Sequence, residues 1–574
     1  MKRSDMFDAN TYDAIVMGGG PHGITYAHWL TEHRPGSRVA VVERNSTPGF
    51  KIGESTLSSA TRSLIATGLP MPVLRRLFGN KAGIRFWWTG SETDQLHRHL
   101  DVVDIEETFQ VERRVLEIAL QEVISRRPGV ELITGMKVDL QKSDIEESVK
   151  KIVCRTAEGE ERIMQAPMIC DASGPAAILA RSRKLLRSEP ERNNTFTTNS
   201  YYAYFRQTGT PDLRFWNEPA TRHICFPGGW TWFITLTSWE KTSDENLRQM
   251  IRFLLDHPAG ADETYPSREQ LCEQFNCVNE QITSIGFVVR DDKDETKGMN
   301  AEESFTRYVE KHPGLAKVME NYELIEDPYT GRPSYGSFHN LVRDSKQVAG
   351  DGWAIVGDAG IFVNPIFSPG MNLGSGTSYL AAKATAEGLS KGDLSRATFR
   401  EYEEYVHQIY DALVNETDLY YRSFEHPDSF EWGVMLKLVF GAADIVQRNM
   451  VYSEEDLYAH DLLNPEFRSI VDRARSRMRR GEEGGELPEE VAVEVKEIIY
   501  PFIRQTLAKP EVRRLRLASL FNQYNGRGER VEKKYRRPRA FGVRKCQRCS
   551  LWSDRSLQQC PVCHTPSSSK ERVK

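Results

Sequence analysis

Long apolar runs are missing from this chain of 574 residues. None reaches the roughly 18 residues that a membrane-spanning helix needs, so the sequence predicts no integral membrane protein. An excess of one charge is missing too, because 76 basic and 81 acidic side chains leave a formal net charge of −5. So small a charge on so long a chain gives no global field that would attract nucleic acid or a membrane surface. We therefore expect neither as a partner.

Cysteine is scarce as well. Of nine cysteines, five are scattered through the body of the chain and four form two close pairs near its end. The start, MKRSDMFDANTYDAIVMGGG, has no secretory pattern, because its first apolar run enters a glycine loop instead of a cleavage site. Scattered cysteines without a leader are typical of a reducing compartment, so we expect a cytoplasmic protein.

The sequence is long enough for more than one hydrophobic core, and its 39% hydrophobic and 27% charged residues are usual for a soluble protein. Strand, helix and strand patterns follow one another over residues 12–43, which predicts a βαβ unit. Aromatic-rich strand patterns over residues 195–240 predict an antiparallel sheet. Helical spacing prevails from about residue 371 onward, and no internal repeat is present.

A glycine loop, GGGPHG, lies between the first strand and the helix of this unit. Gly18, Gly20 and Gly23 hold the glycine positions of a G-x-G-x-x-G pattern. Glycines let the backbone approach a pyrophosphate, while the helix N-terminus supplies amide donors. Glu43 ends the second strand, where a carboxylate accepts hydrogen bonds from ribose hydroxyls. Together these features predict dinucleotide binding.

Two later motifs, DASG at residues 171–174 and GDAG at residues 357–360, each follow a strand-like run. With the glycine loop they resemble the FAD-binding pattern of aromatic hydroxylases, geranylgeranyl reductases and flavin-dependent halogenases. The resemblance implies that Asp358 bonds the ribityl chain or pyrophosphate and that Arg113 lies near the pyrophosphate. Arg113 can also be read as an ordinary exposed helix residue.

The remaining chain holds no second G-x-G-x-x-G after a strand, so we expect no nicotinamide domain and a separate flavin reductase as partner. Aromatic hydroxylases of similar outline, however, accept a nicotinamide without such a motif.

Three further segments resemble flavin-dependent halogenases in particular. KIGEST at residues 51–56 is similar to their flavin-contacting loop, GWTWFI at residues 229–234 to their tryptophan signature, and NKAGIRF at residues 80–86 to the segment with their essential lysine. The resemblance covers roughly residues 10–420. It implies that reduced flavin, dioxygen and halide give hypohalous acid, which travels to a lysine beside the substrate.

Lys81 is the candidate for that lysine. An ammonium group suits this position because it donates a hydrogen bond to the hypohalous oxygen and polarises the halogen. Without its motif, Lys81 would be read as a solvated surface charge. Trp230, Trp232 and Ile234 form the tryptophan signature. The resemblance assigns the two tryptophans to a wall between flavin and substrate, although alternate tryptophans on a strand are also typical of a packed core.

The loop at residues 364–372, NPIFSPGMN, lies where halogenases place flavin and halide. Ser368, Pro369 and Gly370 are the candidate halide site, because amides in a tight glycine turn form an anion-binding concavity. Phe367 stands where the tryptophan-specific branch has a glutamate, which disfavours free tryptophan as substrate. Phenols, pyrroles, and carrier-bound and aliphatic groups remain as candidate substrates, because the branches that act on them also lack this glutamate.

The helical region contains many aromatic residues, including Tyr402, Tyr405 and Tyr410. They fit either a helix core or a lid over the substrate, and we favour the core. The basic segment at residues 526–545 is read as a linker, with local binding to nucleic acid or an acidic partner as the alternative.

Two C-x-x-C knuckles near the end predict a four-sulfur metal site. Its ligands would be Cys546, Cys549, Cys560 and Cys563. Structural zinc is favoured, and iron in a rubredoxin-like ribbon that carries electrons is the alternative. Ordinary halogenases lack this ribbon.

The fold class we predict is α/β: a Rossmann-type FAD-binding domain with an antiparallel substrate-domain sheet, a helical C-terminal region and a metal ribbon. The FAD parts are expected at about residues 10–60, 95–180 and 340–375, the substrate sheet at 61–94 and 181–339, the helical region at 376–525 and the ribbon at 546–566. The residues expected to contact FAD are Gly18, Gly20, Pro21, His22, Gly23, Glu43, Arg44, Lys51, Glu54, Ser55, Arg113, Asp171, Ser173, Gly174, Asp358, Ala359, Gly370 and Met371.

The predicted function is halogenation, with chloride as the expected halide, of an electron-rich specialised metabolite, either free or bound to a carrier protein. A flavin-dependent monooxygenase or another FAD-dependent oxidoreductase is the alternative. A flavin-bearing binding or regulatory protein whose ribbon carries the function is a third reading.

Overall fold

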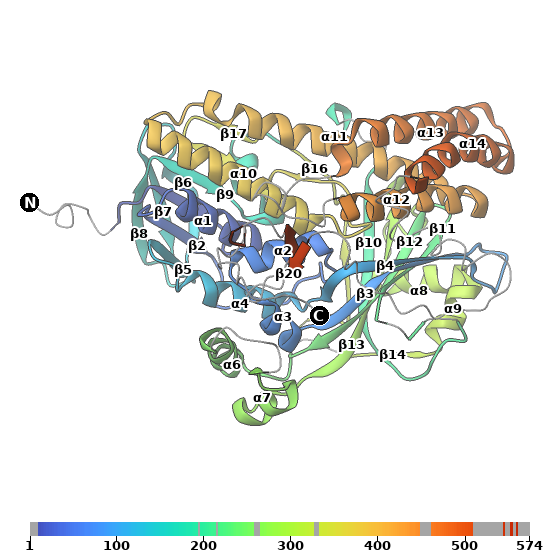
Figure 1. Cartoon of the computed structure of the whole chain (residues 1–574), viewed down its shortest axis with the longest axis horizontal. Helices are drawn as coiled ribbons and strands as arrows, with labels where there is room; N and C mark the ends of the chain where they lie inside the picture. Colours follow the sequence, from blue (N-terminus) through green and yellow to red (C-terminus); the bar gives the residue numbers. More distant parts are fainter. Residues whose placement is uncertain are drawn as a thin grey trace, which may run out of the picture.

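The computed structural model describes residues 10–192, 196–213, 216–217, 219–257, 264–326, 332–447, 461–508, 543–545, 552–554 and 558–560. Two large sheets lie side by side, and helices cover them (Figure 1). In the described part of the chain, no helix is both long enough and apolar enough to cross a membrane.

The first sheet has six strands in the order β17-β18-β9-β1-β2-β5. Its strands are β1 (Ala14–Met17), β2 (Val39–Glu43), β5 (Val130–Thr134), β9 (Met168–Asp171), β17 (Ala349–Gly350) and β18 (Trp353–Ile355). All neighbours are parallel except β17 and β18. β1 and β9 are entirely buried, as strands covered on both faces must be. The expected βαβ unit is confirmed, with α1 (Pro21–His33) between β1 and β2.

The second sheet has eight strands, in the order β14-β10-β13-β12-β11-β3-β4 with β15 beside β10. Its strands are β3 (Gly79–Trp88), β4 (His97–Gln110), β10 (Thr198–Gln207), β11 (Thr221–Phe226), β12 (Gly229–Ser238), β13 (Glu280–Arg290), β14 (Tyr322–Leu324) and β15 (Tyr335–Phe338). The expected antiparallel order holds for every pair except β3 and β11, which are parallel. Between these two strands the chain crosses into the first sheet and returns, and such a crossover is the connection that a parallel pair requires.

The boundaries between the two parts differ from the prediction at one point. We expected the FAD part to resume at about residue 95, but β4 pairs with β3 as far as Gln110. The return to the first sheet is made by α4 (Arg113–Ile124), which leads into β5. A small sheet of β6 (Lys137–Asp144), β7 (Lys150–Arg155) and β8 (Glu161–Ala166) extends this part of the fold.

The remaining helices are arranged around the two sheets (Figure 1). In chain order, α2 (Ser58–Thr67) and α3 (Met71–Leu77) precede β3, α6 (Asp244–Asp256) and α7 (Arg268–Phe275) lie between β12 and β13, and α8 (Ala301–Lys311) and α9 (Pro313–Met319) lie between β13 and β14. α5 (Ile178–Ser182) follows β9, and α10 (Gly370–Lys391) packs against α1. The C-terminal layer consists of α11 (Arg400–Ser423), α12 (Pro427–Gln447), α13 (Pro465–Gly484) and α14 (Pro488–Ala508).

Side chains of the C-terminal layer are mostly core, as expected. Tyr402 and Tyr410 are 3% and 1% exposed and belong to the main hydrophobic core. Tyr405 is partly buried against the same core. The core interpretation of these tyrosines is therefore confirmed.

The two faces of the second sheet hold separate hydrophobic clusters. Trp230, Trp232 and Ile234 lie in one cluster, which we call the aromatic cluster, together with Phe86 and Phe367. Phe233 lies in the cluster on the opposite face. This alternation is the one predicted for the tryptophan signature on a strand.

Candidate active site

The glycine loop makes a close crossing of backbones. Gly18 has a φ of +121°, and a Cβ on it would lie 2.4 Å from the carbonyl oxygen of Ala172. A Cβ on Gly23 would lie 2.0 Å from the carbonyl oxygen of Gly18. A Cβ on Gly20, in contrast, meets no atom within 4 Å. Gly18 and Gly23 therefore serve the packing of the loop, while Gly20 faces open space at the start of α1.

Glu43 is bound to this loop. Its carboxylate accepts hydrogen bonds from the backbone N–H of Gly19 at 2.9 Å and of Asn45 at 3.0 Å. These bonds hold the carboxylate beside the glycine loop, where the sequence places a ribose-binding group. Arg44, the next residue, is exposed.

His22 joins three distant segments of the chain. Its ring fills the space beside Gly357 and Gly374, where an added Cβ would lie 2.1 Å and 2.0 Å from ring atoms. Burial lowers the pKa of His22, against a smaller raising effect of the Asp358 carboxylate. The ring is therefore neutral near pH 7 and acts as a packing element between α1, the GDAG motif and α10.

A pocket opens between the GDAG motif and the start of α10. It is lined by Gly357, Asp358, Ile361, Phe362, Val363, Asn364, Pro369, Gly370, Leu373, Gly374, Thr377 and Leu413. Asp358 lies there with its carboxylate 4.0 Å from the Cβ position of Gly370, and its backbone carbonyl accepts a hydrogen bond from Arg343 at 2.6 Å. The structure thus brings together Asp358 and Gly370, which the sequence predicts to contact FAD.

Asp171 and Ser173 have a structural role in this arrangement. The buried carboxylate of Asp171 accepts hydrogen bonds from the backbone N–H of Ser173 at 2.9 Å and of Leu179 at 2.7 Å, which ties the DASG turn to α5. Burial raises the pKa of Asp171 despite these bonds. Gly174 has a φ of +60° and nothing within 4 Å of its Cβ position, so it faces open space like Gly20.

These features fit a bound dinucleotide. Gly20 and Gly174 leave open space at their Cβ positions, next to a helix N-terminus that favours phosphate. The side-chain oxygen of Asn372, a buried residue in the first turn of α10, has no hydrogen-bond partner among the described residues. A buried acceptor without a partner costs about 1–3 kcal/mol, which a hydrogen-bonding ligand would recover.

The KIGEST loop is tied to α4. Lys51 and Arg113 both form ion pairs with Glu117, at 2.7 Å and 3.0 Å. Arg113 also donates to the carbonyl of Ile52 at 3.4 Å, and a Cβ on Gly53 would lie 2.8 Å from its guanidinium. Arg113 thus holds the loop, and Glu117 is a partner that the sequence pattern did not indicate. The contact of Arg113 with a pyrophosphate stays a prediction.

Glu54 connects the same loop to the second sheet. It is 2% exposed and accepts a hydrogen bond from the hydroxyl of Tyr204 at 2.9 Å. Burial raises its pKa to about 7, although hydrogen bonds from Tyr204 and Ser284 lower it. The following residue, Ser55, shares a hydrogen bond of 2.8 Å with Thr221 on β11.

Lys81 is buried, not a solvated surface charge. Only 1% of it is exposed, and its ammonium group donates to the backbone carbonyl of Thr56, the last residue of the KIGEST loop, at 2.5 Å. Its charge also acts on His223: burial is the main cause that lowers the pKa of His223 to about 3, and Lys81 lowers it further. A cation held in so dry a place is typical of a functional group.

The tryptophan signature is anchored at both indole nitrogens. Trp230 donates to the hydroxyl of Tyr421 on α11 at 2.8 Å, and Trp232 donates to Ser284 on β13 at 3.0 Å. Tyr421 in turn accepts a hydrogen bond from Asn364 at 3.1 Å. The signature is thereby linked to the NPIFSPGMN loop.

That loop has an unusual backbone. Phe367 and Ser368 have φ values of +61° and +56°. Residues other than glycine seldom adopt this left-handed region of the backbone. The ring of Phe367 contacts Phe86 at 5.3 Å and Tyr420 at 4.8 Å between centroids. Aromatic packing on both sides thus fixes the loop, and Ser368, Pro369 and Gly370 follow at the start of α10. Ala359 is buried and Met371 partly buried beside this turn.

The predicted metal ligands fall mostly outside the described residues. Of the four cysteines only Cys560 is described, and it is 3% exposed. A short antiparallel pair, β20 (Val543–Lys545) and β21 (Trp552–Asp554), lies on either side of the first knuckle. In the described ranges no group of three or more metal-binding side chains is present, so the four-cysteine site stays a prediction.

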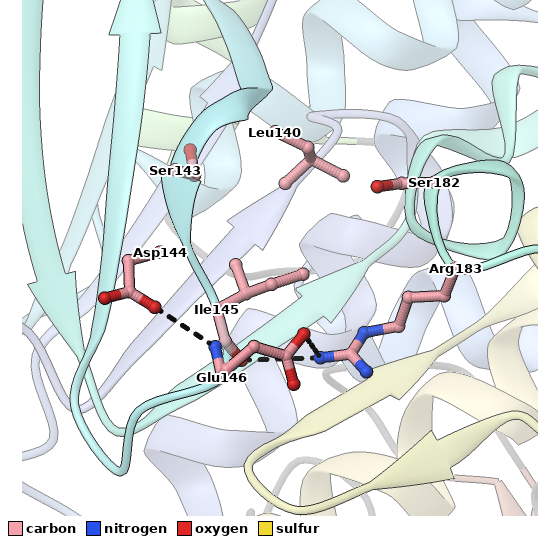
Figure 2. Close-up of a pocket in the computed structure, with 7 residues that line it drawn as sticks. All are labelled: Leu140, Ser143, Asp144, Ile145, Glu146, Ser182 and Arg183. Atoms are coloured by element: carbon pink, nitrogen blue, oxygen red, sulfur yellow. Dashed lines mark hydrogen bonds and ion pairs between the residues drawn. The ribbon is translucent and has the colours of Figure 1, made fainter.

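A second pocket contains none of the predicted site residues. Figure 2 shows it between β6 and α5, where Arg183 reaches the Glu146 carboxylate at 2.9 Å. It is lined by Leu140, Ser143, Asp144, Ile145, Glu146, Ser182 and Arg183. Arg183 and Glu146, the charged pair in this pocket, bind each other, and we assign the pocket no function.

Sequence comparison finds a family model and named relatives. The model described as FAD dependent oxidoreductase matches residues 13–318. A flavin-dependent halogenase, malA of Malbranchea aurantiaca, is 29% identical over 433 residues, 70% of this chain. The match covers 64% of that protein, so this chain spans less than two thirds of its length. A 1H-pyrrole-2-carbonyl peptidyl-carrier protein chlorinase of Pseudomonas fluorescens is 23% identical over 72% of this chain and 84% of its own length.

Solved structures show the same fold. The halogenase PltM in complex with phloroglucinol and FAD superposes with a TM-score of 0.69, at 15% identity, over 89% of this chain and 99% of that one. The flavin-dependent brominase Bmp2 gives a TM-score of 0.59 at 19% identity, over 82% of this chain and 99% of that one. The predicted α/β architecture with a helical C-terminal region is thus confirmed.

Proposed function

Since this chain belongs to the FAD dependent oxidoreductase family and is an FAD-dependent enzyme, we propose that it is a flavin-dependent halogenase of electron-rich specialised metabolites. The observation that carries the proposal is the buried ammonium group of Lys81, bound to the carbonyl of Thr56 at 2.5 Å. It lies at the junction of the KIGEST loop and the sheet that carries the tryptophan signature.

FAD would be held by the glycine loop, by Glu43 and by the pocket at Asp358 and Gly370. When bound and reduced, it supplies two electrons to dioxygen, which takes two more from the halide and so gives hypohalous acid and water. Ser368, Pro369 and Gly370, whose backbone turns at the start of α10, are the proposed halide site. A separate flavin reductase is the proposed source of reduced flavin, and chloride is the proposed halide.

Lys81 would hold the oxidant for the substrate. Its ammonium group donates to the carbonyl of Thr56. An ammonium group in this position can also donate to the oxygen of hypohalous acid, which makes that oxygen a better leaving group and the halogen more electrophilic. The low-exposure surroundings strengthen this bond, because little water competes for it.

The substrate is proposed to be an electron-rich ring, such as a phenol or a pyrrole, either free or carrier-bound. Phe367 is supporting evidence, because its ring lies among Phe86 and Tyr420 and offers an apolar contact where a carboxylate would favour an ammonium-bearing amino acid. The relatives named for a pyrrole group on a carrier protein and for a complex with phloroglucinol support the same substrate classes.

We further propose that the protein works in a reducing cytoplasm, which the scattered free thiols of the body, such as Cys154 and Cys170, support. We also propose that the terminal cysteines bind zinc.

The test is product mass spectrometry. The protein is supplied with FAD, a generic flavin reductase, a nicotinamide cofactor and a panel of phenols, indoles and pyrroles, with chloride or bromide. We expect a halogen isotope pattern in wild-type products and its loss in Lys81→Ala. A gain of one oxygen that does not depend on halide would instead show a hydroxylase and overturn the proposal.

A further inference from the structure

His223, on β11, is a buried histidine that the proposed mechanism does not use. It is 2% exposed and lies on an inner strand of the second sheet. Its register partners are Phe86 on β3 and Trp232 on β12. Its ring stacks on Phe86, with 4.7 Å between centroids and an angle of 13° between planes. On its other side the ring of Trp230 lies 5.0 Å away. The imidazole is thus held between two rings of the aromatic cluster.

One nitrogen of this ring has no partner. Nδ1 of His223 is buried and makes no hydrogen bond with any described residue. A neutral imidazole has one donor nitrogen and one acceptor nitrogen. Because Nδ1 is the nitrogen without a partner among the described residues, we assign the ring proton to Nε2 and the acceptor role to Nδ1.

The neighbouring indoles differ from His223 in this respect, because the N–H groups of Trp230 and Trp232 both have partners. A buried acceptor left without a partner costs about 1–3 kcal/mol. Such a cost persists in a native site when a ligand offsets it.

We infer that Nδ1 of His223 accepts a hydrogen bond from the ring-activating N–H or O–H group of the substrate. The inference rests on the proposed function and adds to it: the substrate must carry a donor, so phenols, pyrroles and indoles qualify and their O- or N-methylated forms do not. His223 is then a binding residue that selects the substrate and fixes which ring position faces Lys81.

The chemistry of the reaction fits this contact. As the carbon–halogen bond forms and the halogen–oxygen bond of hypohalous acid breaks, positive charge spreads from the ring to its heteroatom. The N–H or O–H proton becomes more acidic, and its hydrogen bond to the neutral imidazole strengthens in the transition state. The proton on the attacked carbon then leaves and combines with hydroxide to give water. A protonated histidine would repel this charge, and burial prevents that state.

The experiment compares each substrate with its methylated form: a phenol with its methyl ether, and indole with N-methylindole. In wild-type protein we expect methylation to lower kcat/KM for halogenation by about tenfold or more. His223→Phe keeps the stacked ring but removes the acceptor. It should lower kcat/KM for the unmethylated substrate by a similar factor and abolish the difference between the two substrates. His223→Gln, which keeps an acceptor oxygen, should retain part of that difference.

Release of hypohalous acid in the absence of substrate is the control, and it should be equal in wild-type protein and both variants. A methylation effect of the same size in His223→Phe as in wild-type protein would overturn the inference. The absence of any methylation effect in wild-type protein would also overturn it, and this second test does not depend on whether a variant folds. Wild-type protein that halogenates no substrate of either kind would overturn the proposed function together with it.

Discussion

The ammonium nitrogen of Lys81 lies 2.5 Å from the backbone carbonyl oxygen of Thr56. This bond joins β3 to the end of the KIGEST loop, and the same loop reaches α4 through Lys51 and Arg113. The lysine is therefore placed by the loop that is expected to contact the flavin. In the proposed function, one short segment of backbone would therefore link the place where the oxidant forms to the place where it is used.

A substitution that removes the charge of Lys81 and keeps the length of its side chain should separate its contribution to catalysis from its contribution to stability. We expect Lys81→Met to lose about 10²–10⁴-fold of the halogenation rate with little change in stability. Lys81→Ala should lose the same activity and, through the cavity it leaves, about 2–5 kcal/mol of the free energy of unfolding. Halogenated product and urea denaturation are the measurements. Halogenation by Lys81→Met at the wild-type rate would contradict the assignment.

The glycine loop offers a matched pair of substitutions. Gly23→Ala should destabilise the protein without cofactor by about 1–3 kcal/mol, because the new Cβ would lie 2.0 Å from the carbonyl of Gly18. Gly20→Ala should change that stability by less than about 0.5 kcal/mol, because its Cβ meets open space. It should nevertheless weaken FAD binding by tenfold or more, on the order of 1.4 kcal/mol. Thermal unfolding and FAD titration distinguish the two, and unchanged FAD affinity in Gly20→Ala would remove Gly20 from the cofactor site.

Glu54 should make stability depend on pH. Its pKa is raised by burial from 4.5 to about 7, so the folded protein holds this proton more tightly than the unfolded chain does. The contribution of Glu54 to stability is therefore undiminished below about pH 4.5 and is progressively lost as the pH rises to about 7.

Glu54→Gln keeps an acceptor for Tyr204 and removes the ionisation. Relative to wild-type protein it should be more stable at about pH 8 than at about pH 5, as measured by urea denaturation. Glu147→Gln, at an exposed position, is the control and should show no such difference. An equal effect of Glu54→Gln at both pH values would refute the buried carboxyl as the cause.

The terminal cysteines should bind about one zinc ion per chain. We expect Cys546→Ser combined with Cys549→Ser to release it, as measured by elemental analysis of the purified protein. Cys272→Ser, in the body of the chain, should leave the metal content unchanged. Iron in place of zinc would favour the electron-carrying alternative, and no metal in wild-type protein would remove the ribbon from the prediction.

Local patterns made much of the fold predictable. The βαβ unit, the strands of the tryptophan signature and the buried tyrosines of α11 all follow from periodicity within a few residues. The parallel pairing of β3 with β11 did not follow, because strand order depends on a crossover through the other sheet. The return to the FAD part was expected at about residue 95 and comes after Gln110, because a strand pattern does not tell which sheet the strand joins.

The sequence predicts a site residue where a short motif determines the local geometry. It does not predict a residue whose position depends on a partner far away in the chain. Short motifs predicted Gly18, Asp358 and Lys81 as site residues, and these roles stay predictions. Glu117, which holds Lys51 and Arg113, and Tyr204, which binds Glu54, are ordinary residues in their own segments. His223 gave one available signal, an ionisable residue inside the apolar strand TRHICF, but its stacking on Phe86 needed the fold.

The contact of His22 with Gly357 and Gly374 has a consequence for the order in which the protein is made. β1, α1 and β2 leave the ribosome well before β18 and α10, which enclose the histidine and come more than half a chain later. Until then the glycine loop faces no GDAG motif, and the pocket beside Asp358 does not exist. If FAD binds as proposed, a nascent chain that ends before about residue 374 has no complete cradle for it, so the cofactor would be captured late in synthesis.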